Sequence, residues 1–342
     1  MKKSFNKEFR GKEILITGGT GSIGLGLIRK LIQYKPRLIR ILTNDENSIF
    51  EAKNKDWVER HINTNQKQTE LSFEICDVRD RERLDMAMRG IDIVFHAAAM
   101  KHVDICEDNT FDAIKTNVVG TSNIIETAVK HNIAKFILIS TDKATSPTTT
   151  LGASKLLAER LTVNTGLYNK SVKTIFAAVR FGNVIGSRGS VFQIFLEQIR
   201  KEKPLTVTDP NMTRFIMSIQ DAAELILKAT HISKGGEIFI LKMPSVRILE
   251  LAENMLEVCL KSKNIKKNKI KIIKNRIHDR FQEYLVTPEE IYYCHDLGTM
   301  FKISRQKNLK RISSNELNSE TAKEISKSKL RHIIKEVLED FS

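Results

Sequence analysis

Short apolar runs alternate with helical segments along the first half of the chain, and this alternation constrains the fold more than any other feature. The runs occupy residues 13–17, 38–43, 71–75, 92–98 and 135–140. Helical patterns lie between them, near residues 22, 57, 79–88 and 117–131. Strands that alternate with helices are joined by right-handed crossovers into a parallel sheet with helices on both faces. The pattern therefore predicts an α/β fold with a doubly wound parallel sheet of the Rossmann type.

A second, smaller α/β lobe is predicted after residue 184, where the regular pattern loosens. The later segments are rich in Thr, Pro, Asp and Gly, and they include helical patterns near 219–230 and 247–262 and a short strand at 237–241. We expect residues 1–184 to form the Rossmann domain and residues 185–342 to form the substrate lobe and a helical tail. The helix near 219–230 is expected to return and pack on the first domain.

The composition argues against several classes of protein. No window approaches the roughly 18 consecutive apolar residues of a membrane helix. The four cysteines lie far apart without a C-x-x-C pair, which favours neither a metal site nor a disulfide framework. The net charge of +15 is concentrated in lysine runs such as 261–274, which lack the aromatic residues that nucleic-acid stacking requires. We therefore expect a cytoplasmic protein with no membrane insertion, no metal and no nucleic-acid partner.

The stretch TGGTGSIG follows the first predicted strand and begins the first predicted helix. Its glycines have the spacing G-x-x-G-x-x-G, in which the early glycines permit a tight turn and the third lets the helix pack on the strand. Backbone N–H groups and the positive end of the helix suit a pyrophosphate. We predict a dinucleotide site that includes Gly18, Thr20, Gly21, Ser22, Ile23 and Gly24.

Later stretches extend this predicted cofactor site. A carboxylate after the third strand can accept a hydrogen bond from an adenine amino group, and small residues after the fourth strand allow the cofactor to approach. These features assign to the site Asp77, Val78, Ala97, Ala98 and Asn117; the alternative for Asn117 is an ordinary helix cap. The second strand is followed by two neutral and two acidic residues, TNDE at 43–46, so NAD and NADP both stay open.

The segment STDKATSPTTTLGASK, residues 140–155, carries the candidate catalytic groups. Nicotinamide-dependent enzymes often have Tyr-x-x-x-Lys here, but Leu151 stands four residues before Lys155. The adjacent Asp142 and Lys143 are instead the candidate groups for proton transfer. Adjacent side chains on a regular strand point to opposite faces, so we expect the backbone to bend at TDKAT.

Eight motifs follow one another between about residues 13 and 240: TGGTGSIG, DVRD, HAAAMKHVDICE, KTNVVGT, STDKA, GASK, RFGNVIGSRGSV and TDPNMTRFIMS. With them the chain resembles the UDP-N-acetylglucosamine 4,6-dehydratases of polysaccharide biosynthesis, which are extended short-chain dehydrogenases/reductases and include C5-inverting capsule enzymes. Residues 283–303 continue the resemblance more weakly. It implies a tightly bound NADP or NAD that is regenerated in each turnover, a UDP-sugar substrate and a homo-oligomer.

In that family hydride passes from sugar C4 to the nicotinamide, a base removes the C5 hydrogen, water leaves from C6 with help from an acid, and hydride returns to C6. The resemblance places the acid on Asp142 and the base on Lys143. The base must be neutral, and Lys155, the oxidised nicotinamide and desolvation are expected to disfavour its proton. Some relatives lack the tyrosine, so the C4 proton is left to Asp142, Thr141 or a water near Lys155.

The resemblance also implies substrate-binding residues: Lys101, Asn183, Arg188, Arg214, Arg276 and Glu283. Arginine suits bidentate contact with a pyrophosphate. The segment RIHDR, 276–280, departs from the Arg-His-Gly-Glu-Lys that is usual in relatives, which leaves the exact UDP-sugar open. C5 inversion is also open. Two other functions remain: a UDP-sugar 4-epimerase, which eliminates no water, and a catalytically inactive cofactor-binding protein with a structural or regulatory role.

Overall fold

The computed structural model describes residues 2–63, 69–168, 172–262, 269–274, 280–308 and 312–339. Of the predicted site residues, Arg276 lies outside these ranges.

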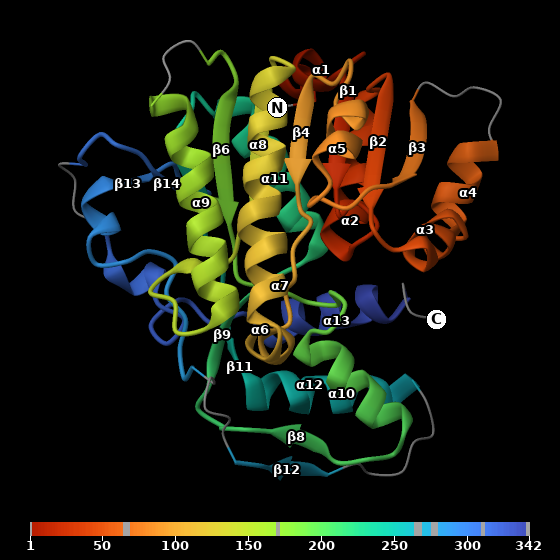
Figure 1. The fold of residues 1–342 in the computed structure, drawn as a ribbon. Coiled ribbons are helices and arrows are strands. Elements are labelled where there is room, and N and C mark those ends of the chain that lie inside the picture. The colour runs from red at the N-terminus through yellow and green to blue at the C-terminus, as the bar shows by residue number, and fades with distance from the viewer. Residues whose placement is uncertain are drawn as a thin grey trace.

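A nine-stranded sheet forms the centre of the molecule (Figure 1). In spatial order its strands are β13 (Cys294–Asp296), β14 (Met300–Ile303), β10 (Glu237–Leu241), β6 (Ile175–Arg180), β5 (Lys135–Ile139), β4 (Ile93–His96), β1 (Glu13–Thr17), β2 (Leu38–Thr43) and β3 (Glu70–Ile75). The strands from β10 to β3 are parallel, and β14 and β13 continue the sheet in antiparallel pairing. The predicted doubly wound parallel sheet is confirmed.

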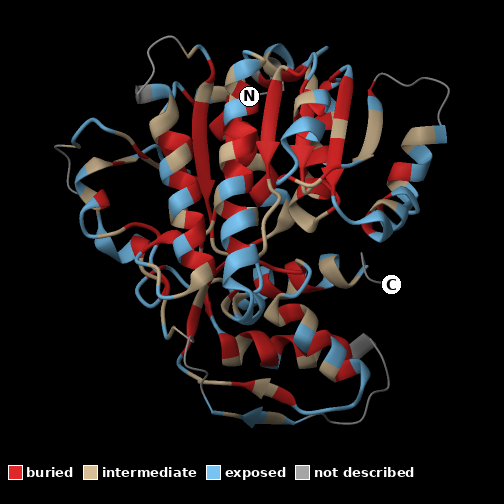
Figure 2. Cartoon of the chain, in the orientation of Figure 1, coloured by how far each residue is buried: buried red, intermediate tan, exposed pale blue. Residues whose placement is uncertain are grey.

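Helices cover both faces of the sheet (Figure 1). On one face α5 (Arg81–Ala87), α8 (Gly120–Lys130) and α9 (Thr150–Tyr168) lie side by side. On the other, α2 (Ser22–Leu31) packs against α11 (Ile219–Ile232), which also contacts α1 (Lys2–Phe9). The central strands between these layers are almost wholly buried, whereas the edge strand β3 is only partly buried (Figure 2), as expected where a parallel sheet is covered on both sides.

A second hydrophobic core lies beyond the carboxyl ends of the parallel strands (Figure 1). It is built from α10 (Val191–Arg200), α12 (Ile248–Ser262), α13 (Lys327–Glu339) and the strand pair β8 (Leu205–Val207) and β12 (Ile270–Ile272). A small sheet of β7 (Asn183–Val184), β9 (Thr213–Met217) and β11 (Ser245–Arg247) lies where the two cores meet.

The sequence grouped the strand at 237–241 with the second lobe, and this grouping is wrong. The strand, β10, pairs in parallel with β6 and is buried along Glu237–Ile240. A strand of such apolar character is stabilised by lying within a covered sheet rather than at an edge. The division of the chain near residue 184 stays a prediction.

A buried ion network ties β6 to α9 and to the segment before β13. The guanidinium of Arg180 is fully buried, and its Nη2 lies 2.6 Å from Oε2 of Glu159. Its Nη1 lies 2.8 Å from Oε2 of Glu290 and donates to the backbone oxygen of Leu285 at 2.8 Å. These bonds attach the C-terminal segment that carries Glu283 to the main sheet.

Candidate active site

The glycine turn joins β1 to α2 and packs against the loop that follows β4. Gly18 has a φ of 63°, and a Cβ on it would lie 2.7 Å from the backbone nitrogen of Ala98. A Cβ on Gly24 would lie 2.4 Å from Cα of Gly19, so only glycine lets α2 approach the turn this closely. No side chain caps the helix at Gly21. The turn therefore has the shape and the donors that suit a dinucleotide pyrophosphate.

A chain of buried hydrogen bonds fixes the loop after β4. The N–H of Ala98 donates to Oγ1 of Thr17 (3.2 Å), which lies 2.7 Å from Nδ1 of His96; the Thr17 hydroxyl donates to this nitrogen when the neutral ring carries its proton on Nε2. Nε2 of His96 then donates to Oγ1 of Thr121 (2.9 Å), whose hydroxyl donates to the backbone oxygen of Asn117 (2.6 Å). Burial lowers the pKa of His96 to about 3, and the neutral ring suits this chain. Sequence reasoning missed His96, although a histidine at the end of an otherwise apolar strand indicates a buried polar contact.

Asn117 is buried in a π-helical turn, Lys115–Val119, and does not cap a helix. Its side chain accepts from the backbone N–H of Met100 (2.8 Å) and donates to the Met100 oxygen (3.0 Å). It also donates to Oγ of Ser154 on α9 (3.0 Å). Asn117 therefore positions the loop beside the glycine turn, and its contact with a cofactor stays a prediction.

Asp77 lies after β3 and binds its neighbour Arg79. Nη2 of Arg79 lies 2.6 Å from Oδ2, and the Arg79 backbone N–H donates to Oδ1 at 2.8 Å. The hydrogen bond from Arg79 lowers the pKa of Asp77. Val78 packs on Gly120, where a Cβ would lie 2.6 Å from a Val78 methyl group. Asp45, after β2, caps α3 (Glu46–Lys53) by accepting a hydrogen bond from the backbone N–H of Asn47. One of the two acidic side chains near the expected ribose position therefore already has a hydrogen-bond donor.

The chain bends directly after β5, as expected at TDKAT. Residues Asp142–Ala144 form a 3-10 turn, and Oγ1 of Thr141 accepts from the Lys143 backbone N–H. Asp142 is 1% exposed, and its Oδ1 accepts from Nζ of Lys143 (3.2 Å) and Oγ1 of Thr141 (3.0 Å). Among the residues that the structure describes, no N–H or O–H group donates to the buried Oδ2. The bend brings an acid and an amine together, with one carboxyl oxygen left for a further partner.

Glu283 joins this pair from the C-terminal half of the chain. Its Oε1 lies 3.3 Å from Nζ of Lys143 and 3.4 Å from Nε of Arg214. Its Oε2 accepts from the side-chain amide of Asn183 (2.9 Å). The structure thus gathers Asp142 and Lys143 with Asn183, Arg214 and Glu283, three of the predicted substrate residues, in one cluster.

Asp142, Lys143 and Glu283, at the centre of the cluster, shift one another's pKa values. Burial and the Glu283 carboxylate raise the pKa of Asp142 to about 7, although Lys143 opposes them. Burial would raise the pKa of Glu283, but Lys143 and Arg214 outweigh it and lower the pKa to about 2. Burial would lower the pKa of Lys143, but Asp142 and Glu283 outweigh it and raise the pKa. Of the two carboxyl groups, Asp142 is therefore the one that holds a proton more readily, as a general acid requires.

The charged amine of Lys143 differs from the sequence argument, which required a neutral base. Two carboxylates face the amine, and the cation that opposes its charge is Arg214. Lys155 donates to the backbone oxygen of Ile139 (2.7 Å), and burial lowers its pKa to about 8. Lys143 must hand its proton to a neighbour before it can act as a base.

Replacing Glu283 with glutamine is expected to lower the pKa of Asp142 toward its ordinary value, because a like charge is removed from a buried site. A ¹³C-carboxyl NMR titration measures this pKa, which is about 7 in the parent chain. Glu316→Gln, which alters a carboxylate paired with Lys242 instead, serves as the control. An unchanged Asp142 titration in Glu283→Gln would contradict the assigned coupling.

Leu151 takes the usual place of tyrosine and is 4% exposed. It packs with Cys106 and Ala113, and Met100 and Val103 border the same small apolar cluster. Its side chain offers no group for proton transfer.

Lys101 and Arg188 lie beside the glycine turn. Nζ of Lys101 donates to the backbone oxygen of Arg188 (2.6 Å), and the Arg188 backbone N–H donates to Oγ of Ser22 (3.1 Å). Their contact with the UDP-sugar stays a prediction.

Arg280 was missed as a site residue, although it replaces the lysine usual in relatives. Its guanidinium donates to Oγ1 of Thr148 (3.1 Å) and to the backbone oxygens of Thr145 (3.1 Å) and Ser146. Ser146 has a φ of 46°, in the left-handed region. A planar guanidinium can bind several loop oxygens at once, which a lysine ammonium matches poorly. Arg280 thereby holds the loop that follows Lys143.

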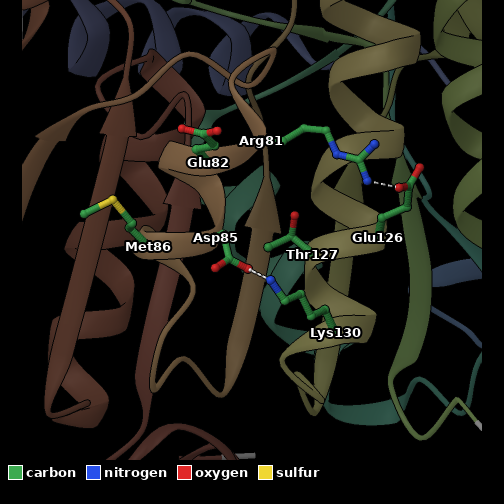
Figure 3. Close-up of a pocket in the computed structure, with 7 residues that line it drawn as sticks. All are labelled: Arg81, Glu82, Asp85, Met86, Glu126, Thr127 and Lys130. Atoms are coloured by element: carbon green, nitrogen blue, oxygen red, sulfur yellow. Dashed lines mark hydrogen bonds and ion pairs between the residues drawn. The ribbon is translucent and has the colours of Figure 1, made fainter.

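A surface hollow of about 520 Å³ lies between α5 and α8, away from this cluster (Figure 3). Two ion pairs line it, Arg81 with Glu126 and Lys130 with Asp85. Exposed paired charges of this kind bind weakly. We place the candidate site at the carboxyl edge of the sheet, where buried titratable groups gather. Within the described ranges, no group of three or more His, Cys, Asp or Glu side chains is arranged to hold a metal ion.

The fold and this cluster define a Rossmann-type protein with a polar site at the carboxyl ends of its strands. The family described as Polysaccharide biosynthesis protein matches residues 14–305, and the chain belongs to this family. A protein of Methanocaldococcus jannaschii, named an uncharacterized membrane protein, is 46% identical over 336 residues, which cover 96% of this chain and 97% of that protein. In the part of this chain that the structure describes, no helix has the length and apolar character to cross a membrane.

Other relatives carry more specific names. A UDP-glucose 4-epimerase of Rickettsia felis is 38% identical over 297 residues, covering 86% of this chain and 83% of the relative. The X-ray structure of Pen from Bacillus thuringiensis has a TM-score of 0.88 at 39% identity and covers 96% of this chain and 98% of its own. The structure of a dTDP-glucose 4,6-dehydratase of Streptomyces venezuelae with NAD has a TM-score of 0.67 at 19% identity. It covers 79% of this chain and 86% of its own, and at this identity it supports the fold alone.

Proposed function

We propose that this chain binds NAD or NADP and converts UDP-N-acetylglucosamine, or a close UDP-sugar, to a 4-keto-6-deoxy product. The family of polysaccharide biosynthesis proteins provides the setting, and the motifs of the sequence favour this reaction within it. C5 inversion, the exact sugar and the homo-oligomeric state remain predictions.

The cofactor assignment is supported by the fit of the glycine turn. Gly18 and Gly24 leave room that a Cβ would fill, and the start of α2 offers backbone donors. A bound nicotinamide would supply the oxidation at C4 and the reduction at C6. Thr20 is buried within the turn and bonds to Ser48, so it supports the shape of this site.

The protons are assigned to three side chains. Lys143 first passes a proton to Oε1 of Glu283 or Oδ1 of Asp142, which lie 3.3 and 3.2 Å from its Nζ. The neutral amine can then take the C5 hydrogen, while protonated Asp142 donates to the departing C6 hydroxyl. The Lys143 ammonium is restored by the C5 proton, so the ion pair that the structure favours is regenerated at this step.

One observation carries the proposal: an acid with a raised pKa and an amine lie side by side, while the tyrosine position is filled by a buried leucine. A dehydratase needs this acid and base at neighbouring carbons. The second candidate is a UDP-sugar 4-epimerase, which is favoured by the names of relatives that are 38–40% identical. An epimerase makes the ketone but has no need of a C5 base.

Incubation of the purified protein with UDP-N-acetylglucosamine in heavy water is expected to yield a product that has lost one water and carries deuterium at C5. The physical reason is that the side chain of Lys143 is 30% exposed, so its amine can exchange with solvent between proton removal and return. Mass spectrometry and proton NMR measure both changes.

An unchanged mass with inverted C4 would support the epimerase instead. Loss of water without deuterium at C5 would contradict the role of Lys143. Dinucleotide binding with no conversion of any UDP-sugar would favour a catalytically inactive protein.

A further inference from the structure

Residues 186–190, here named the strap, cross from the second lobe to the glycine turn. The strap connects β7 to α10, and Gly186 and Gly189 give it left-handed turns with φ of 78° and 71°. The Arg188 backbone N–H donates to Oγ of Ser22, the first residue of α2 (3.1 Å). A Cβ on Gly189 would lie 2.0 Å from Cε1 of His102, which follows β4. The strap therefore lies against the segments that follow β1 and β4.

The side chain of Arg188 reaches a third segment, the one that follows β2. Its Nη2 lies 2.6 Å from Oε2 of Glu51 on α3. The side chains are 44% and 60% exposed, and an ion pair this exposed is weak. A phosphate accepts bidentate hydrogen bonds from a guanidinium and can compete for it. Arg188 can thus exchange Glu51 for an anion without disturbing a buried contact.

We infer that Arg188 and the strap hold the phosphate groups of the dinucleotide against the glycine turn, so that the second lobe helps to retain the cofactor. This inference rests on the proposed function. The sequence resemblance placed Arg188 on the UDP-sugar, whereas the structure joins it to Ser22 and Glu51, on the two helices that follow β1 and β2. In a Rossmann fold these are the segments that face the dinucleotide.

Lys101 strengthens the inference as a second cation at the same place. Its Nζ donates to the Arg188 backbone oxygen (2.6 Å). Burial and the nearby guanidinium lower the pKa of Lys101, so an anion between the two cations would relieve their repulsion. A cofactor that is reduced and reoxidised within one turnover gains from such retention.

Arg188→Gln is the direct test, with dissociation constants for NADH and NADPH measured by nicotinamide fluorescence on protein freed of bound cofactor. We expect the constant to rise roughly 10- to 100-fold for at least one dinucleotide, because charge-assisted hydrogen bonds are lost. The dissociation constant for UDP, measured by calorimetry, is expected to stay the same. An effect on NADPH alone identifies the adenosine 2′-phosphate as the ligand, and an equal effect on both identifies the pyrophosphate.

Arg247→Gln is the matched control, because Arg247 is 46% exposed and pairs with the carboxylates of Glu250 and Glu324. It is expected to change neither constant. Glu51→Gln should have the opposite effect, tightening dinucleotide binding by about 2- to 5-fold, since it removes the competing carboxylate. Gly189→Ala, which forces a side chain into His102, should weaken dinucleotide binding as Arg188→Gln does.

Weaker UDP binding with unchanged dinucleotide binding in Arg188→Gln would overturn the inference and return Arg188 to the substrate. Unchanged binding of both would also overturn it. If the parent protein binds neither dinucleotide, the proposed function itself fails, which is a distinct result.

Discussion

Replacing Lys143 with methionine is expected to reduce the rate of sugar conversion by roughly 10²- to 10⁴-fold, the usual contribution of a positioned acid or base. Methionine keeps much of the length of the side chain but cannot take the C5 hydrogen. Dinucleotide binding should be unchanged, because the glycine turn is built by β1, α2 and the loop after β4. Single-turnover kinetics and fluorescence titration measure the two properties separately.

Lys242→Met is a close control for this change. Lys242 also lies between two carboxylates, with Nζ 2.8 Å from Asp296 and 2.9 Å from Glu316, and its side chain is 23% exposed. It has no place in the candidate site, so conversion should proceed at the parent rate. A Lys143→Met variant that converts the sugar within a few-fold of the parent would exclude the amine as the base.

Arg180→Met should destabilise the fold by about 3–5 kcal/mol, because it leaves two buried carboxylates without their partner. Both Glu159 and Glu290 bond to the Arg180 guanidinium, and none of the three side chains is more than 8% exposed. Urea unfolding followed by circular dichroism measures the loss of free energy of unfolding.

Two further variants show how much of the lost stability comes from unpaired buried charge and how much from lost packing. Arg247→Met breaks an exposed pair and should cost about 0–1 kcal/mol. Adding Glu159→Gln and Glu290→Gln to Arg180→Met should recover part of the loss, because the unpaired charges are then removed. Equal costs for Arg180→Met and Arg247→Met would show that the buried network contributes little.

The features that sequence predicted well are local. The apolar runs and the helical segments between them predict the parallel sheet, because strand and helix periods are read within a few residues. The glycine turn and the bend at Asp142 follow from short stretches whose backbone requirements are visible in their own residues.

The features that sequence missed join distant parts of the chain. Lys143 and Glu283 are 140 residues apart, and Arg280 binds Thr145 across 135 residues. No pattern within one segment shows that these groups meet, and so the charge on Lys143 could not be foreseen. The placement of β10 beside β6 failed for the same reason, since an apolar strand fits either core by its own pattern.

The attachment of the C-terminal segment to β6 links folding to acid strength. Arg180 anchors Leu285, two residues beyond Glu283, and burial together with the Glu283 carboxylate raises the pKa of Asp142. If that segment detached, Asp142 would lose the repulsion of the Glu283 carboxylate, and its pKa would fall. Opening of this segment alone would therefore change the proton balance at Asp142 while the main sheet stays folded.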